Sequence, residues 1–286
     1  MTDTPTTGCD TVTQFGESLI QHGELNDRIY LMKLAPQDAA EMPEKLREMA
    51  KAEGYSKVFA KVPGPCRGGF EKAGYQIEAL VPGFYRGEED GAFLGLYLDL
   101  ERQKDPHAEQ AEKALKIARE KANERSGPTA LAEGFTLREC RPEDAEAMAK
   151  LYATVFKTYP FPIDQPSFLK QNMAEDVIYF GIWEGERLVA LSSAEMDPKA
   201  GNAEMTDFAT LPEFRGAGHA SALLTMMHQR MAELGIATAY TIARAVSVGM
   251  NVTFARAGYR YAGRLINNTQ ISGGFESMNV WYHPLG

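Results

Sequence analysis

The sequence has little of what marks several large classes of protein. Its 286 residues include three cysteines, Cys9, Cys66 and Cys140, without paired spacing, so neither a disulfide framework nor a zinc site is predicted. No apolar run approaches the roughly 20 residues of a membrane-spanning helix, and the first thirteen residues lack the basic and apolar regions of a signal peptide. The five histidines show no metal spacing. We therefore expect a cytoplasmic protein with no metal and no membrane partner, and a disordered tail over residues 1–14.

The sequence also lacks an excess of positive charge. Thirty Lys and Arg residues stand against 39 Asp and Glu residues, which gives a net charge of −9. Nucleic-acid binding depends on neutralising phosphates, so we expect no nucleic-acid partner and favour a cationic or small-molecule substrate. The length of 286 residues suggests one large or two modest domains, and 44% hydrophobic residues is an ordinary value for a folded, soluble chain.

A charged stretch divides the chain. From residue 101 to residue 125, six acidic and seven basic residues are interspersed, and Ala111, Leu115 and Ala118 form a thin apolar stripe, which predicts a connecting helix with one face packed and the rest solvated. Ser126-Gly127-Pro128 is expected to end it. The predicted domains are an N-terminal partial domain at 15–100, a linker helix at 101–128 and a catalytic domain at 129–286.

The two sides of this stretch repeat each other. FEKAGY at Phe70–Tyr75 matches FARAGY at Phe254–Tyr259, and a looser match, Met49–Gly54 with Met231–Gly235, lies upstream. A strand-like segment follows in both halves. Three echoes in register predict a duplicated helix–strand–helix–strand unit.

The second half alternates as a mixed α/β domain does. Strands are predicted over residues 135–138, 178–183, 188–195, 204–211 and 239–243. A glycine-containing loop and then an amphipathic helix separate the last two of these strands.

That loop carries the clearest chemical signal. Residues 206–220 read TDFATLPEFRGAGHA, so a strand runs into a loop that opens a helix. N–H groups at a helix N-terminus can converge on a phosphate, Gly216 and Gly218 allow close approach, and Arg215 adds positive charge. The spacing predicts a pyrophosphate site, and the alternative is a plain strand-to-helix turn with a surface arginine.

Arg215-Gly-Ala-Gly-His-Ala220 resembles the acyl-CoA loop of the GNAT family of acetyl-CoA-dependent N-acetyltransferases, and Phe254-x-x-x-Gly258-Tyr259 resembles that family's second cofactor segment. The resemblance implies an α/β fold with a mixed central sheet flanked by helices, splayed after the loop strand, and acetyl-CoA as co-substrate.

The first half has only the second segment, so we expect a smaller, degenerate α/β half-domain of similar topology that packs against or covers the catalytic one. The implied cofactor-binding residues are Ala209, Thr210, Leu211, Arg215, Gly216, Ala217, Gly218, His219, Ala220, Asn251 and Phe254. Asn251 either contacts the cofactor or caps its helix, and His219 is expected on the solvent side.

A narrower group, the β-lysine Nε-acetyltransferases of bacteria and archaea, is similar over nearly the whole chain, including EMTDFATLP at 204–212 and YPFP at 159–162. The similarity implies acetyl transfer to the side-chain amine of β-lysine by direct attack in a ternary complex, as in the synthesis of the osmolyte Nε-acetyl-β-lysine. The alternatives are another small amine or polyamine as acceptor, or a non-catalytic CoA-binding sensor, and a homodimer stays open. The expected substrate-binding residues are Tyr159, Phe161, Asn267, Asn268, Glu276 and Asn279.

Acetyl transfer to an amine needs a base, because a lysine-type ammonium has a pKa of about 10.4. The family resemblance implies that the loop strand supplies this base, Glu204 or Asp207, and an oxyanion donor, the backbone of Ala209 or Thr210. The two acids are three residues apart and face opposite sides of a regular strand unless a bulge realigns them, and we favour Glu204.

The acid that protonates the leaving thiolate is less clear from the sequence. Where the family often has a tyrosine, this chain has Phe254, which cannot donate a proton. Either another hydroxyl, Tyr259 or Tyr282, serves as the acid, or the thiolate leaves unaided.

Overall fold

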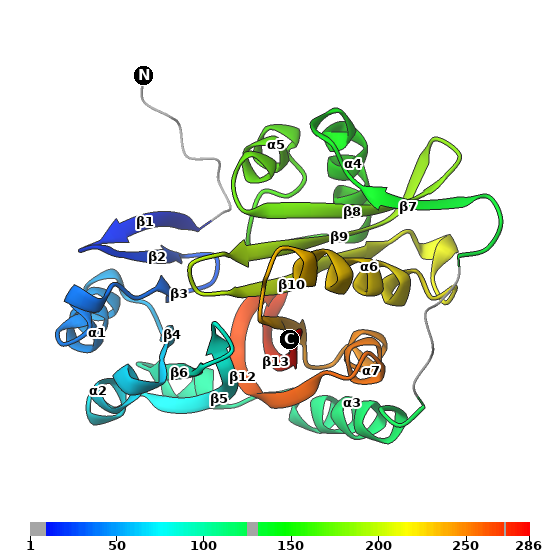
Figure 1. Cartoon of the computed structure of the whole chain (residues 1–286). Helices are drawn as coiled ribbons and strands as arrows, with labels where there is room; N and C mark the ends of the chain where they lie inside the picture. Colours follow the sequence, from blue (N-terminus) through cyan, green and yellow to red (C-terminus); the bar gives the residue numbers. More distant parts are fainter. Residues whose placement is uncertain (1–9, 125–130, 272) are drawn as a thin grey trace.

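The structure, a computed structural model, describes residues 10–124, 131–271 and 273–286. Within them, thirteen strands form one sheet in the order β1-β2-β3-β4-β6-β5-β12-β13-β11-β10-β9-β8-β7, flanked by helices (Figure 1). The strands are β1 (Thr11–Phe15), β2 (Ser18–Gly23), β3 (Arg28–Lys33), β4 (Lys57–Pro63), β5 (Gln76–Tyr85), β6 (Glu89–Tyr97), β7 (Phe135–Glu139), β8 (Val177–Glu184), β9 (Arg187–Asp197), β10 (Asn202–Thr210), β11 (Thr238–Arg244), β12 (Arg260–Ile271) and β13 (Gly274–Pro284). The α-helices are α1 (Met42–Glu53), α2 (Arg67–Lys72), α3 (Ala108–Lys121), α4 (Ala145–Val155), α5 (Pro166–Ala174), α6 (His219–Glu233) and α7 (Val248–Arg256).

Two predicted boundaries differ from the structure. Residues 1–9 of the predicted tail lie outside the described residues, but Thr11–Phe15 pair with β2 as an edge strand, so the tail does not extend to residue 14. The charged stretch is α-helical only from Ala108. Its first residues belong to a separate 3-10 helix, Leu100–Gln103, at whose start the Asp99 carboxylate accepts from the Glu101 N–H at 2.9 Å.

The two halves of the chain share one topology. The first half has the order β1-β2-β3-β4-β6-β5, and the second repeats it as β8-β9-β10-β11-β13-β12. In both, a helix crosses over to a parallel strand (β3 to β4, β10 to β11), and a second helix leads to a hairpin. This agrees with the repeat seen in the sequence. The second half adds β7, α4 and α5.

The repeated six-residue segment is a helix end. After α2 and α7, Gly74 and Gly258 take left-handed φ values of 89° and 87°. The next N–H, of Tyr75 or Tyr259, donates back to the carbonyl of Phe70 or Phe254, at 3.1 Å in both copies. Each Phe ring packs edge-on against its Tyr ring with centroids 5.1 Å apart. Only glycine takes this backbone conformation easily, which explains the Phe-x-x-x-Gly-Tyr pattern.

The halves join edge to edge where β5 meets β12. Their antiparallel pairing is centred on Ala79 and Gly263, and each of these lies nine residues after the Phe of its repeat. Equivalent positions therefore face each other across a local pseudo-two-fold axis. A Cβ on Gly263 would lie 2.1 Å from the carbonyl oxygen of Glu78 and 2.7 Å from the Cα of Ala79, so the strands reach this distance only with glycine there.

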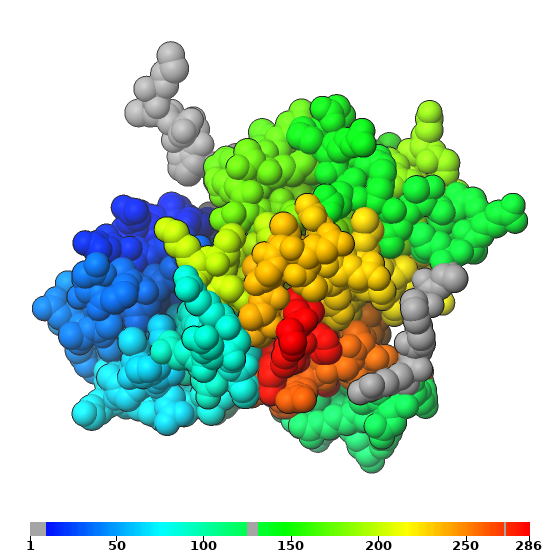
Figure 2. Space-filling model, viewed as in Figure 1, coloured from blue at the N-terminus to red at the C-terminus, as the bar shows by residue number. Residues whose placement is uncertain are grey.

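Buried polar contacts fasten this junction. The Lys57 Nζ donates to the Glu78 carboxylate at 2.9 Å and to the Ile266 carbonyl at 2.8 Å, and the Ile266 N–H donates back to Glu78 at 2.9 Å. Burial lowers the pKa of Lys57 to about 8, although Glu78 acts to raise it. The N-terminal half therefore continues the catalytic sheet and does not cover it as a separate lid (Figure 2).

The charged helix α3 packs through one face, as its apolar stripe predicts. It buries Ala111, Ala114, Leu115 and Ala118 and lies against α7 (Figure 1). No helix in the described ranges is long and apolar enough to cross a membrane.

The junction yields a stability prediction. Gly263→Ala forces backbone against backbone, so we expect the free energy of unfolding to fall by at least about 2 kcal/mol in chemical denaturation. Gly69→Ala is the control, because a Cβ at that helical position meets nothing within 4 Å. Equal stability of the two variants would contradict the importance of this contact.

Candidate active site

A gap opens in the sheet between β10 and β11. The two strands pair in parallel only from Asn202–Glu204 to Thr238–Tyr240, and beyond Glu204 they separate. The cofactor gap, as we call it, has a volume of about 680 Å³ and is lined by the diverging strands together with the starts of α6 and α7. The resemblance implied a sheet splayed at this strand.

The start of α6 provides an anion site at the rim of the cofactor gap. Gly216 and Gly218 have φ values of 86° and 80°, and Gly218 caps the helix without a side-chain acceptor for its first N–H groups. Arg215, Gly216, Gly218 and His219 line the gap. Free N–H groups at the positive end of a helix dipole, beside an arginine, favour a phosphate. His219 is buried here, and not on the solvent side as predicted.

The loop strand contains a bulge at Asp207. Its φ is 56°, and the register between β10 and β9 shifts between Thr206 and Ala209. The extra residue brings Glu204 and Asp207 to the same cavity, although they are three positions apart. The realignment that the sequence left open therefore occurs.

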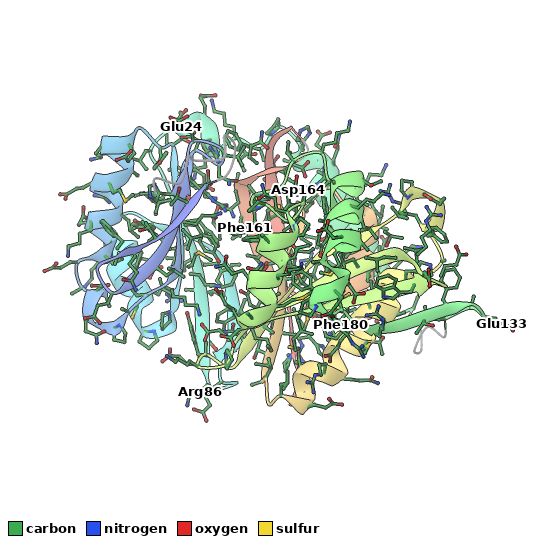
Figure 3. All side chains as sticks on the ribbon, turned by 90° about the horizontal axis from the view of Figure 1, so that it is seen from above. Glu24, Arg86, Glu133, Phe161, Asp164 and Phe180 are labelled. Atoms are coloured by element: carbon green, nitrogen blue, oxygen red, sulfur yellow. The ribbon has the colours of Figure 1, made fainter. Side chains whose placement is uncertain are left out.

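This acceptor cavity of about 180 Å³ adjoins the cofactor gap. Their linings share six residues: Tyr159, Thr206, Asp207, Ile242, Ile271 and Met278. One wall comes from the N-terminal half, through Arg28, Tyr30, Phe59 and Lys61, and the facing wall carries Glu195, Glu204 and Asp207. Seen from above, Phe161, another lining residue, lies near the middle of the molecule, between the two halves (Figure 3).

Asp207 is held firmly. Its Oδ2 accepts from the Ser193 hydroxyl at 2.6 Å, and its Oδ1 accepts from the Tyr159 hydroxyl. Burial raises the pKa of Asp207, although the hydrogen bonds from Ser193, Tyr159 and Thr206 act to lower it. With both oxygens engaged, this carboxylate is suited to fixing Tyr159 and the bulge.

Glu204 lies in a row of polar side chains across the sheet. It is in register with Glu195 on β9 and with Tyr240 on β11. Burial raises the pKa of Glu204, and burial with the charges of Asp207 and Glu204 raises the pKa of Glu195 well above its usual value. A carboxylate with a raised pKa is a better proton acceptor for an amine.

Lys61 is the lysine that contacts this row of polar side chains. Its Nζ donates to the Tyr240 hydroxyl at 2.9 Å. Burial acts to lower the pKa of Lys61, but Tyr30 and Glu204 outweigh it and the pKa is raised. One lysine faces three carboxylates, so this part of the cavity suits a further cation such as a protonated amine.

Comparison with known proteins identifies the family. The model described as "Acetyltransferase (GNAT) family" matches residues 145–259. The Beta-lysine N(6)-acetyltransferase of Methanococcus maripaludis is 40% identical over 95% of this chain and 97% of its own. The chain belongs to the GNAT acetyltransferase family. A Methanosarcina mazei protein of the same name is 33% identical over 84% of this chain and 95% of its own, and the N-acetyltransferase YodP of Bacillus subtilis is 31% identical over 94% and 96%.

The structure of this GNAT chain brings many of the predicted residues together. Those that line the cofactor gap are Thr210, Arg215, Gly216, Gly218, His219, Ala220 and Phe254. Those that line the acceptor cavity are Tyr159, Phe161, Glu204, Asp207 and Asn268. Ala209 and Leu211 are instead buried against the α4 and α5 side of the sheet, and Ala217 lies outside the lining of the gap.

Four predicted binding residues have structural partners instead. The Asn251 amide donates to the carbonyls of Arg244 and Ser247 and accepts from Asn279 and Trp281, so it fixes the entry to α7. Glu276 pairs with Arg244. The Asn267 amide donates to the carbonyls of Arg102 and Lys104. Neither Asn251, Asn267, Glu276 nor Asn279 is part of either lining.

The two candidate tyrosine acids also lie elsewhere. The Tyr259 hydroxyl forms a 2.8 Å hydrogen bond with the His228 Nε2, and burial raises its pKa well above 10. Tyr282 is buried beside Tyr240 in the core between the halves. Neither lines the cofactor gap, so the prediction of a catalytic acid at Tyr259 does not fit this placement.

Sequence reasoning missed the groups supplied by the first half. On β3, Tyr30 is in register with Phe59 of β4. In the catalytic half, Glu204 on β10 is in register with Tyr240 of β11 in the same way. Tyr30 therefore holds the position equivalent to Glu204. Aligning the two copies strand by strand would have revealed Tyr30, and Lys61 lies two residues beyond Phe59 on the same face. Glu195 would have followed from the predicted pairing of its strand with that of Glu204.

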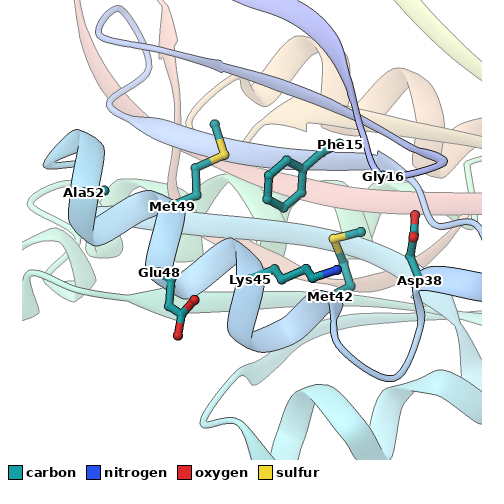
Figure 4. Close-up of a pocket in the computed structure, with 8 residues that line it drawn as sticks. All are labelled: Phe15, Gly16, Asp38, Met42, Lys45, Glu48, Met49 and Ala52. Carbon is teal, nitrogen blue, oxygen red and sulfur yellow. The ribbon is translucent and has the colours of Figure 1, made fainter.

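A third hollow lies between the β1–β2 turn and α1, with Phe15, Met42 and Met49 around it (Figure 4). Of its three charged groups, Glu48 is exposed, and Asp38 and Lys45 have partners within the chain. Asp38 accepts from the Ser18 hydroxyl at 2.6 Å, and Lys45 pairs with Glu41 at 2.8 Å. We assign it no ligand.

Proposed function

We propose that this GNAT protein transfers the acetyl group of acetyl-CoA to the side-chain amine of β-lysine. The observation that carries the proposal is an acidic cavity that meets the cofactor gap at Asp207 and Thr206. An amine bound among its carboxylates would reach the gap directly. Relatives that match nearly the full length of the chain bear the name of β-lysine N(6)-acetyltransferase, which supports the choice of amine.

Acetyl-CoA would lie in the cofactor gap, with its phosphates at the start of α6 and beside Arg215. It supplies a thioester, whose carbonyl carbon is open to attack. The N–H of Thr210 is suited to donate a hydrogen bond to the carbonyl oxygen as negative charge develops on it. The Leu211 N–H donates to Val189 on β9, so the neighbouring N–H and C=O of Thr210 face away from β9. The Thr210 carbonyl accepts from the Arg215 Nε at 3.2 Å on that side.

Glu204 would act as the base, directly or through water. It takes a proton from the side-chain ammonium, and the freed amine forms a bond to the acetyl carbon while the carbon–sulfur bond breaks. The electron pair leaves on the thiolate sulfur, and the second proton of the attacking nitrogen passes to that thiolate, directly or through water, so that a neutral amide and a thiol are formed. Phe254 lines the gap where a tyrosine often stands in the family, so α7 offers no tyrosine proton donor at that position.

An amine panel tests the substrate. Thiol release from acetyl-CoA is measured with β-lysine, lysine, putrescine and spermidine, and we expect the highest kcat/KM with β-lysine. Preference for a polyamine would replace the proposed acceptor. Tight CoA binding without turnover of any amine would instead indicate a CoA-binding sensor.

The base is tested by the pH profile of two variants. Because its raised pKa keeps Glu204 protonated at low pH, kcat/KM of the wild type should rise with pH through that pKa. Glu204→Gln should lower kcat by about 100-fold or more and abolish this rise of kcat/KM with pH, the acidic limb of the profile. Asp207→Asn should retain the acidic limb. Glu213→Gln, an exposed carboxyl paired with Arg187, is the control. Loss of the limb in Asp207→Asn but not in Glu204→Gln would assign the base to Asp207.

A further inference from the structure

We propose that the N-terminal half of the chain holds the receptor for the carboxylate of the acceptor, with Arg28 as its cation and Gln21 as its hydrogen-bonding partner. The proposal rests on the proposed function and deepens it. It assigns the acceptor to the amino acids that carry a distal amine, in preference to plain diamines.

Arg28 is a buried cation whose bonding is incomplete. It is 4% exposed at the start of β3 and lines the acceptor cavity. One terminal nitrogen donates to the Asn268 carbonyl and, at 3.3 Å, to the Thr269 hydroxyl. Among the described residues, its Nε has no hydrogen-bond partner and no carboxylate lies within ion-pair distance of it. A buried, unpaired guanidinium is costly, and a ligand carboxylate would supply the missing counter-charge.

Gln21 is a second buried polar side chain of the acceptor cavity whose hydrogen-bonding groups lack partners among the described residues. It faces Tyr30 across the β2–β3 ladder, is 1% exposed and lines the same cavity. Neither its amide oxygen nor its amide nitrogen has a partner among the described residues, and the Asn268 Oδ1 is also unpartnered. Buried amide groups are almost always satisfied, so three such atoms around one cavity indicate a polar ligand.

The unpartnered groups match the head of a β-amino acid. The Arg28 Nε–H and the Gln21 amide N–H can donate to a carboxylate. The Gln21 Oε1 and the Asn268 Oδ1 can accept from an ammonium two carbons away. Lys61 is not suited to this role, because it is already engaged with Tyr240 and the acidic row.

The cavity thus has a cationic end at Arg28 and an acidic end at Glu195 and Glu204. Arg28 lies at the end of the cavity beside Asn268 and Thr269, whereas Glu195 and Glu204 lie opposite each other on β9 and β10. Between the two ends, the rings of Tyr30 and Phe59 stack with centroids 4.6 Å apart and both line the cavity. A ligand anchored at Arg28 would lay its methylene chain over these rings and present its distal amine to Glu204.

The test compares two acceptors that differ only in the carboxylate. They are β-lysine and 1,4-diaminopentane, the diamine left when the carboxyl group of β-lysine is removed. We expect the wild type to prefer β-lysine by about 100-fold or more in kcat/KM, as a site built to pair a polar group rejects the analogue without it. Arg28→Gln should lower kcat/KM for β-lysine by about 100-fold, mainly through KM, and leave 1,4-diaminopentane within about threefold.

Further variants distinguish a specific role of Arg28 from a general loss of structure or charge. Arg28→Lys should restore part of the preference, and Arg47→Gln, a surface arginine of the same half paired with Glu44, should leave it unchanged. If Arg28→Gln does not fold, Gln21→Leu makes the test, because it removes no existing hydrogen bond of the structure and should lower the same preference. Equal losses on both acceptors, or unchanged kinetics with β-lysine, would overturn the proposal.

Failure of the proposed function is separable from failure of this inference. If the enzyme acetylates a different diamine, the Arg28 variants are compared on that pair instead, such as lysine with cadaverine or ornithine with putrescine. If no diamine is turned over, the proposed function fails, and calorimetry with CoA present compares binding of β-lysine and 1,4-diaminopentane. Equal binding, or binding that Arg28→Gln does not change, contradicts the carboxylate receptor.

Discussion

The close antiparallel contact of β5 with β12 at Ala79 and Gly263 is the constraint on which the rest of the molecule depends. It joins two half-sheets of the same topology into one sheet, and the buried Lys57–Glu78–Ile266 contacts hold their register. Because equivalent strands meet, the corresponding faces of β3 and β10 come to line a single cavity. A duplicated fold thereby acquires a site that neither half would form alone.

The two copies of the fold contribute different parts of the site. The catalytic half has the glycine loop before α6, the bulge at Asp207 and the acidic row that includes Glu204. In the first half, the connection from β3 to α1 contains no glycine, and Tyr30 stands in the position of Glu204. What that half supplies is the opposite wall, with its aromatic rings, Lys61 and Arg28. In this account it determines which acceptor binds, while the second half carries out the transfer.

Much of this could be predicted from sequence, and the failures have physical causes. Gly216, Gly218 and the Phe-x-x-x-Gly-Tyr segments were readable because each requires a special backbone conformation that leaves a local pattern. Polar residues crowd the end of the chain, which predicts binding roles for Asn267, Glu276 and Asn279, but these side chains bond to backbone carbonyls or pair with neighbouring arginines. Arg28 and Gln21 could not be found, because their meaning depends on the contact between the halves and no local pattern encodes it.

The central claim is that the acceptor binds between the two halves. A crystal structure of the protein with CoA and β-lysine tests it most directly. The account predicts the carboxylate of β-lysine at Arg28, its methylene chain along Tyr30 and Phe59, and its side-chain amine beside Glu204, facing the thiol in the gap. A β-lysine molecule held wholly by residues of the second half, with Arg28 and Gln21 still unpartnered, would contradict it.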